Sequence, residues 1–395
     1  MIFNEVTYFI AFLLPCVLVF HLGPGWLRPW VLATFGLLFF VFYGAIHFGG
    51  AWGALCALIF VWELITSRLY RERSIFCILG IIQAVAILIV FKYTRFFAVA
   101  WNDMAGLVGG LPLLDGPPPL VFPLGLSFFT FEFIHFAVDS YRGKTRDAPL
   151  GSYAAFIFFF PSMVAGPLKR YQEFASELGH ARFNAQQVQQ GVTRILAGLV
   201  KKHVFADTFA LWADQLNTAA ALSADRLSLV GWLLAYGMKI YFDFSAYSDI
   251  AIGSGYLFGI AIPENFNWPY LSRNISEFWR RWHISLGRWI FDYIYAPLGG
   301  SRRGEWRTSL NLVATFAVSG LWHGAAYNFV VWGLWHGLLM VGHRSWSRFS
   351  EPRGLRIPAF AAQALTFTCV IIGWAFFCME FGQAWHVLSR IAGVA

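Results

Sequence analysis

Apolar segments alternate with short polar segments along the whole chain. A membrane-spanning helix needs about 20 mostly apolar residues, and most of these segments approach that length. The pattern therefore predicts an all-α, polytopic membrane protein with about 10 or 11 membrane helices. This number includes re-entrant or interfacial helices: the stretch 276–297 is apolar on one side only and is expected to be of this kind. Spans are expected near 7–21 (an uncleaved first span), 30–48, 51–67, 75–99 and 119–140, and further apolar helices near 151–166, 188–213, 228–260, 308–326, 328–343 and 357–379.

The charges between these segments predict the orientation of the chain. The loops at 68–74 and 141–149 are rich in Lys and Arg, whereas the loop at 100–118 holds two Asp and no basic residue. Cytoplasmic loops collect Lys and Arg. We therefore expect a multi-pass protein of the inner (plasma) membrane, with the N-terminus and the Gly- and Pro-rich loop 109–123 outside.

Composition supports the bilayer as the main solvent. Of the 395 residues, 58% are hydrophobic and only 13% are charged, whereas a soluble domain carries about 25% charged residues. The net charge of +8 is explained by basic cytoplasmic loops, so we expect contact with membrane lipids and no nucleic-acid partner. We predict one transmembrane domain over 1–395, with N-terminal helices in 1–118 and a motif-bearing core in 119–380.

Several common site patterns are missing from the sequence. None of the five cysteines forms a CxxC pair, and we find no metal-ligand spacing, no phosphate-binding loop and no Ser-His-Asp order. We therefore expect neither a metal nor a bound cofactor. His135 stands alone in an apolar span, which favours a packing role.

The strongest local signal is the segment Gly320-Leu-Trp-His-Gly324. His323 follows a long apolar run, so about 15 helical residues place it about 22 Å along the helix, deep in the membrane. A polar ring at that depth needs a partner or a cavity. Two readings are equally supported by the sequence: a structural hydrogen bond, or a general base that titrates near neutral pH.

A second cluster is the segment from Glu277 to His283, with sequence EFWRRWH. As one helix it would place Trp279, His283 and Leu286 on one side and pair Glu277 with Arg281. An interfacial helix anchored by tryptophans is the simpler interpretation. The alternative is a phosphate-binding surface beside a functional imidazole, with enough positive charge for a nucleotide-like donor from Arg273, Arg280, Arg281 and Arg288.

A third cluster lies inside the apolar segment 228–260. Asp243 and Asp249 are carboxylates within a predicted span, and such residues are functional candidates because burying them unpaired is costly. An ion pair between Lys239 and Asp243, one turn apart, is the structural alternative. For His336, in Trp335-His-Gly337, we favour an interhelical hydrogen bond.

The order of these motifs resembles the membrane-bound O-acyltransferase (MBOAT) superfamily, and most of all its alginate O-acetyltransferase-like branch. The resemblance covers about 120–380. It implies a many-helix fold with a tunnel between the membrane faces, an essential histidine at His323 and a second at His283. The segments that carry it are 122–131, 139–143, 160–167, 198–202, Tyr241-Phe-Asp-Phe-Ser-Ala-Tyr-Ser-Asp249, 277–285, 295–300, 321–324, Trp332-Gly333 and Trp335-His-Gly337.

Two departures from the alginate branch bear on the function. Members usually continue for several helices after a Trp-Phe-Phe-Arg-like segment, whereas this chain has Cys378 in place of that Arg and ends at Ala395. Teichoic-acid D-alanyl transferases are similar and shorter, but they usually lack the Pro-Leu-Gly-Gly-Ser-Arg-Arg-Gly run at 297–304. This run favours the acetyl branch.

The resemblance implies an O-acetyltransferase that passes acetyl groups from cytoplasmic acetyl-CoA, or another acyl thioester, across the membrane to an exported polysaccharide. A separate periplasmic or extracellular acyltransferase is the expected partner. His323 would be the general base and His283 would orient donor or acceptor. D-alanyl transfer to teichoic acid and, in another class, a proton-coupled transporter remain alternatives. Further donor or substrate contacts are assigned to Trp279, Arg280, Arg281, Asp243, Tyr247, Trp322 and Asn274.

Overall fold

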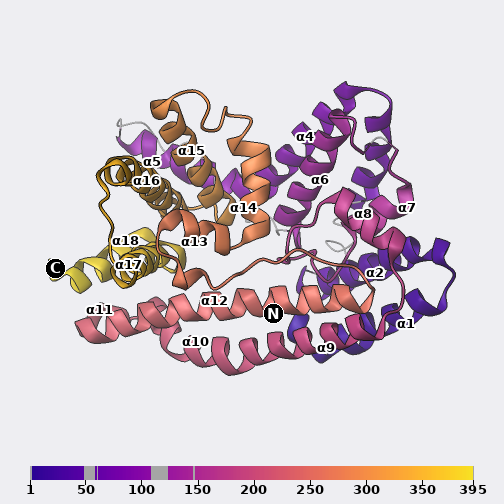
Figure 1. Ribbon diagram of the computed structural model, residues 1–395, viewed down its shortest axis with the longest axis horizontal. Coiled ribbons are helices and arrows are strands. Elements are labelled where there is room, and N and C mark those ends of the chain that lie inside the picture. Colours follow the sequence, from indigo (N-terminus) through magenta and orange to yellow (C-terminus); the bar gives the residue numbers. More distant parts are fainter. Residues whose placement is uncertain (1, 49–57, 60, 108–122, 146, 395) are drawn as a thin grey trace. The chain divides into compact units, whose positions relative to one another are not determined.

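Helices form the regular secondary structure of the protein (Figure 1). The computed structural model describes residues 2–48, 58–59, 61–107, 123–145 and 147–394. Strand-like pairing among them is limited to an isolated antiparallel bridge between Phe266 and Trp282, so the all-α prediction is confirmed. The helices are α1 (Leu14–Leu22), α2 (Arg28–Phe48), α4 (Ser74–Leu88), α5 (Thr94–Leu107), α6 (Leu126–Tyr141), α7 (Leu150–Ile157), α8 (Tyr171–His180), α9 (Ala185–Val200), α10 (Asp207–Ala213), α11 (Ala220–Ser223), α12 (Arg226–Leu257), α13 (Ile275–Arg281), α14 (Ile284–Ile290), α15 (Glu305–His323), α16 (Tyr327–Ser350), α17 (Ala359–Cys378) and α18 (Phe381–Ala392).

Three helical segments are long and apolar enough to cross a membrane: Gly25–Ile46, Ser74–Leu107 and Ala359–Cys378. Tyr8–Leu22 is apolar but shorter. Other long helices of the described chain, such as α12 and α15, include Asp, Lys, Asn or Ser among their apolar residues. The larger number of membrane helices therefore stays a prediction.

Two element boundaries differ from the sequence prediction. α5 runs through residues 100–107, which we expected to begin an external loop, because the Gly- and Pro-rich stretch that disfavours a helix starts only after them. The rest of that loop, 108–118, and 109–122 of the Gly- and Pro-rich loop lie outside the described residues, as does most of the first half of the expected span 51–67. α7 ends at Ile157 instead of continuing to 166, since Pro161 follows and disfavours helical backbone in the residue before it.

The chain forms two compact units. Unit 1 comprises Met1–Leu196 and Asp249–Pro263, and unit 2 comprises Ala197–Ser248 and Glu264–Ala395. Two of the three boundaries fall within α9 and α12, and the third follows Pro263. One transmembrane domain with a boundary at 118 stays a prediction.

Unit 1 is built around aromatic packing between short helices. α4 packs on α6, and α2 packs on α7. Phe136 of α6 stacks on Tyr153 of α7 with ring centroids 3.9 Å apart, and Tyr171 of α8 meets Phe136 edge-on at 5.1 Å. The buried side of α6 also carries polar residues, which are described with the candidate site.

Unit 2 contains the close packing of α15 on α16. A Cβ atom on Gly320 of α15 would lie 2.1 Å from the carbonyl oxygen of Phe329, and one on Gly333 of α16 would lie 2.3 Å from that of Phe316. Gly337, one turn after Gly333, also faces α15. Small residues at this spacing let helix backbones approach closely, which favours association in lipid. These glycines therefore set the distance between the helices that carry His323 and His336.

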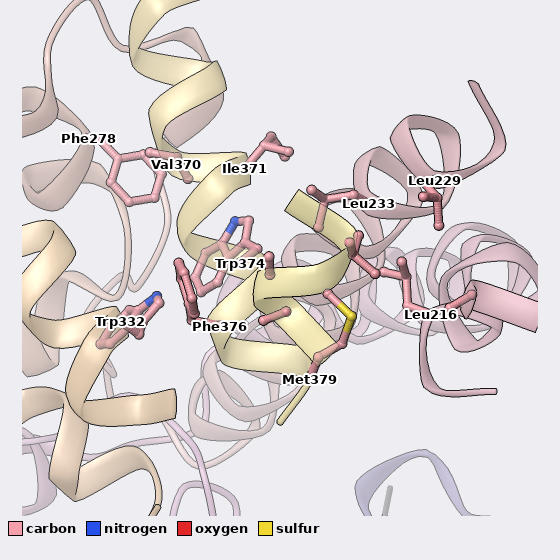
Figure 2. Close-up of a cluster of buried hydrophobic side chains, with 14 of the residues drawn as sticks. Leu216, Leu229, Leu233, Phe278, Trp332, Val370, Ile371, Trp374, Phe376 and Met379 are labelled. Atoms are coloured by element: carbon pink, nitrogen blue, oxygen red, sulfur yellow. The ribbon is translucent and has the colours of Figure 1, made fainter. Parts of the chain in front are cut away.

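An apolar core joins α16 and α17 to α12 and α13 within unit 2. Trp332 of α16 and Trp374 of α17 stack with centroids 6.1 Å apart, and both side chains are 1% exposed. Figure 2 shows Trp374 projecting from α17 among these side chains, with Leu233 of α12 in the same cluster. Dense packing of this kind holds α16 and α17 in place, because aromatic pairs add attraction beyond the area they bury.

Candidate functional site

The EFWRRWH segment is not one continuous helix. α13 ends at Arg281 and α14 begins at Ile284, and His283 between them has a left-handed backbone with φ of 47°. The prediction that Trp279, His283 and Leu286 share one face of a helix is therefore wrong. A left-handed conformation at a residue other than glycine costs about 1–3 kcal/mol, and such strain is frequent at functional sites.

Backbone pairing with an earlier segment produces this break. The Asn267 amide donates to the Arg281 carbonyl at 2.9 Å, and the Ile284 amide donates to the Asn265 carbonyl at 3.0 Å. These bonds use groups that an uninterrupted helix would pair internally. His283 is thereby turned into the interior of unit 2, where it is 2% exposed.

The side chains of Asn274 and Glu277 cap the N-terminus of α13. The Asn274 side chain accepts from the Glu277 amide at 2.8 Å, and a Glu277 carboxylate oxygen accepts from the Arg273 amide at 2.8 Å. This reciprocal arrangement resembles a capping box. Glu277 also pairs with Arg281 at 2.6 Å, which confirms the predicted i,i+4 pair. Asn274 thus caps a helix, and its assignment to the donor stays a prediction.

His323 is the last residue of α15 and lies half-buried among aromatic rings. Its ring centroid is 4.6 Å from that of Trp322, 5.1 Å from Trp332 and 5.1 Å from Phe377. Trp322 also meets the ring of His283, with centroids 6.5 Å apart. The fold of unit 2 thus brings both predicted histidines to the same tryptophan, although 40 positions separate them in the sequence. Whether His323 lines a cavity stays a prediction.

Trp279 and His336 extend this aromatic cluster. Trp279 meets Trp332 at 5.7 Å and His336 at 5.0 Å between ring centroids. His336 is fully buried, and neither ring nitrogen has a hydrogen-bond partner in the described part of the chain. The predicted interhelical hydrogen bond of His336 is therefore wrong, because aromatic faces and edges surround the ring.

Both carboxylates of the YFDFSAYSD segment have cationic partners, but not the predicted one. Lys239 pairs with Asp214 at 2.5 Å, so the expected Lys239–Asp243 pair is wrong. Asp243 instead lies 2.9 Å from Lys202 in unit 2. In unit 1, the Asp249 carboxylate accepts from Arg194 at 2.6 Å. The sequence did not reveal these partners because they come from other helices.

Lys202 lies in a short π-helical segment. Residues 201–206 form a π-helical segment between α9 and α10, a feature frequent at functional sites. The Lys202 ammonium also lies 2.8 Å from Asp207. Tyr247 of α12 is buried, at 2% exposure. Direct contacts of Asp243 and Tyr247 with a substrate stay predictions.

Several of the arginines assigned to a charged donor remain accessible in unit 2. Arg273, Arg280 and Arg288 are exposed, whereas Arg281 is paired with Glu277. Exposed guanidinium groups can form bidentate hydrogen bonds with phosphates. The geometry is therefore compatible with phosphate recognition by this group, which stays a prediction.

A buried polar network in unit 1 was not predicted. Lys169 pairs with Glu132 of α6, and both are almost fully buried. Three residues along the same helix, His135 lies 3.3 Å from Asp139, which also accepts from Gln172 at 2.6 Å. The expected packing role of His135 therefore misses its contact with the Asp139 carboxylate. Glu132, His135 and Asp139 are spaced so that they share one face of a helix, and this pattern was the sequence signal for the network.

Comparison with known proteins places the chain in one family. The MBOAT (membrane-bound O-acyltransferase) family matches residues 121–383. A probable alginate O-acetylase of Pseudomonas aeruginosa is 39% identical over 81% of this chain, and the match spans 61% of that protein. A peptidoglycan O-acetyltransferase of Helicobacter pylori is 31% identical, over 100% of this chain and 80% of its own. A teichoic acid D-alanyltransferase of Bacillus subtilis is 28% identical, over 70% of this chain and 74% of its own. Because the family match spans residues 121–383, most of the chain, the chain belongs to the membrane-bound O-acyltransferase family.

Proposed function

We propose that the protein is a membrane O-acetyltransferase that moves an acetyl group from a thioester to a hydroxyl of an exported polysaccharide. The observation that carries this proposal is the meeting of His283 and His323 at Trp322 inside unit 2. Family membership and similarity to a probable alginate O-acetylase support the reaction class. Acetyl-CoA is the proposed donor.

His323 is the proposed general base. It takes the proton of the accepting hydroxyl while that oxygen attacks the thioester carbonyl carbon. The carbon–sulfur bond then breaks, and the proton passes to the departing thiolate. The rings of Trp322, Trp332 and Phe377 surround His323, and their apolar surfaces disfavour water beside the bound thioester, which limits its hydrolysis.

His283 and the neighbouring groups are proposed to hold the donor and acceptor in register. The His283 ring is fixed by its left-handed backbone and by edge-on contact with Phe244, with centroids 4.6 Å apart. The indole N–H of Trp279 has no acceptor among the described residues, so it is available to a substrate carbonyl. The exposed arginines Arg280 and Arg288 attract the phosphates of the donor.

The decisive experiment compares wild-type protein with His323→Ala in reconstituted membranes. Labelled acetyl-CoA, a polysaccharide acceptor and the periplasmic acyltransferase partner are supplied. Loss of a general base typically lowers the rate by about 10²–10⁴-fold. His180→Ala is the matched control, because His180 is an exposed histidine of unit 1. Near-wild-type transfer by folded His323→Ala would overturn the assignment.

The same assay distinguishes acetyl transfer from a second candidate function. The similarity to a teichoic acid D-alanyltransferase favours D-alanyl transfer as the second candidate. A D-alanyl thioester is therefore tested beside the acetyl donor at equal concentration. Transfer of D-alanine without transfer of acetate would replace the acetyltransferase proposal with this second one.

A further inference from the structure

Asn265 is a fully buried polar residue of unit 2 that lies outside the predicted site residues. Its side-chain oxygen accepts two hydrogen bonds from Ser285, from the backbone amide at 3.2 Å and from the hydroxyl at 2.7 Å. Its side-chain nitrogen donates to the Ser248 hydroxyl at 3.3 Å. Its own carbonyl accepts from the Ile284 amide at 3.0 Å. All of its side-chain hydrogen bonds are therefore made within unit 2, to two separate segments.

These bonds surround the backbone of His283. Ile284 and Ser285 are the two residues that follow His283, and both of their amides donate to Asn265. These are first-turn amides of α14, which have no partner within the helix. Asn265 satisfies them from outside and thereby begins α14 directly after the left-handed residue. Replacing the Asn265 side chain removes both bonds to Ser285 and leaves the backbone bond to Ile284, so the turn at His283, with its φ of 47°, loses part of its support.

The side-chain nitrogen of Asn265 contacts the helix that packs against the His283 imidazole. Ser248 belongs to α12, and one turn earlier on that helix Phe244 meets the His283 ring edge-on. Asn265 therefore connects the backbone that carries His283 to the helix against which the ring packs. A single side-chain amide thus contacts both Ser285, two residues after His283, and Ser248, one turn from Phe244.

We infer that Asn265 is a positioning residue for His283, which it holds in the orientation that acyl transfer requires. The inference rests on the proposed acyltransferase function. It differs from a general structural role in one measurable respect: the effect of Asn265 on turnover is transmitted through His283.

A double-mutant cycle tests this difference, because residues that act as one unit give non-additive effects. Asn265→Leu is expected to lower kcat by about 10- to 100-fold, as a displaced catalytic group does. In the His283→Ala background the same substitution is expected to change kcat little. Equal losses in both backgrounds, or full activity of His283→Ala, would overturn the inference.

Asn311 supplies the matched control. It is also a buried asparagine of unit 2, and its side chain donates to the carbonyls of Leu298 and Gly300 at 3.2 and 3.0 Å, in a different turn. Any effect of Asn311→Leu on kcat is expected to be the same in the wild-type and His283→Ala backgrounds. Ser285→Ala replaces Asn265→Leu in the cycle if the latter does not fold, since it removes the 2.7 Å bond from the Ser285 hydroxyl and keeps the bond from the Ser285 amide.

Hydrogen–deuterium exchange of the purified protein tests the positioning without relying on turnover. Asn265→Leu is expected to accelerate exchange in peptides that cover 282–287, whereas Asn311→Leu leaves them protected. Unchanged protection in Asn265→Leu would overturn the inference. If the wild-type protein transfers no acyl group but exchange rises as expected, the proposed function fails while the positioning of His283 stands.

Discussion

Gly333→Ala should disrupt acyl transfer by separating α15 from α16. The new Cβ would lie 2.3 Å from the carbonyl oxygen of Phe316 and 3.1 Å from the Cα of Ala317. Both neighbours are backbone atoms of α15, so no side chain can rotate to make room. Ordinary contacts begin near 3.4 Å, and the two helices must therefore move apart locally by about 1 Å.

This displacement occurs close to the proposed base. His323 ends α15 two turns after Phe316, and its ring packs on Trp332, which precedes Gly333. A misplacement of about 1 Å can lower turnover by about 10²-fold. Overpacking also typically destabilises a well-packed interior by about 1–3 kcal/mol. We expect both a lower kcat and a lower melting temperature.

Gly342→Ala is the control on the same helix. A Cβ there has no heavy atom within 4 Å, and Ala is favoured over Gly in a helix by about 0.8–1.0 kcal/mol. Acetyl transfer and thermal unfolding in detergent are measured for both variants at equal membrane abundance. Wild-type kcat and melting temperature for Gly333→Ala would refute the role given to this helix contact.

Two further predictions concern orientation and unit 1. Cysteines introduced at 71 and 144 should be protected from an impermeant reagent applied outside, whereas one at 110 should react; the opposite labelling would reverse the proposed topology. Lys169→Met should lower stability by about 3–5 kcal/mol, because Glu132 would be left as a buried charge without its partner. The double variant with Glu132→Gln should regain part of that loss in a thermal-unfolding assay, and a further loss would show that the pair does not act as described.

Much of the architecture followed from patterns that are local in the sequence. Apolar runs and the scarcity of charge predicted an all-helical membrane protein, because helices satisfy their backbone groups within one segment. The motifs around His283 and His323 indicated the family because each is contained in a few consecutive residues. The Glu277–Arg281 pair could be predicted because residues four apart on a helix are neighbours.

Other features depend on contacts between distant segments, and only the tertiary structure decided them. The partner of Asp243 is Lys202, from another helical segment, and not Lys239 one turn away. An ion pair depends on which charges the fold brings close together, and sequence spacing alone does not determine this. The Glu132–Lys169 pair escaped prediction for the same reason.

The break at His283 shows the physical reason most clearly. Local propensity predicts one helix for the EFWRRWH segment, but hydrogen bonds accepted by Asn265 and one donated by the Asn267 amide interrupt it. Backbone bonds between residues 14 and 19 positions apart, as in Asn267–Arg281 and Asn265–Ile284, have no signature in either segment alone. The sequence by itself determined which chemical groups are present and which family they indicate, whereas the orientation of the imidazole was decided by the long-range pairing of the backbone that carries it.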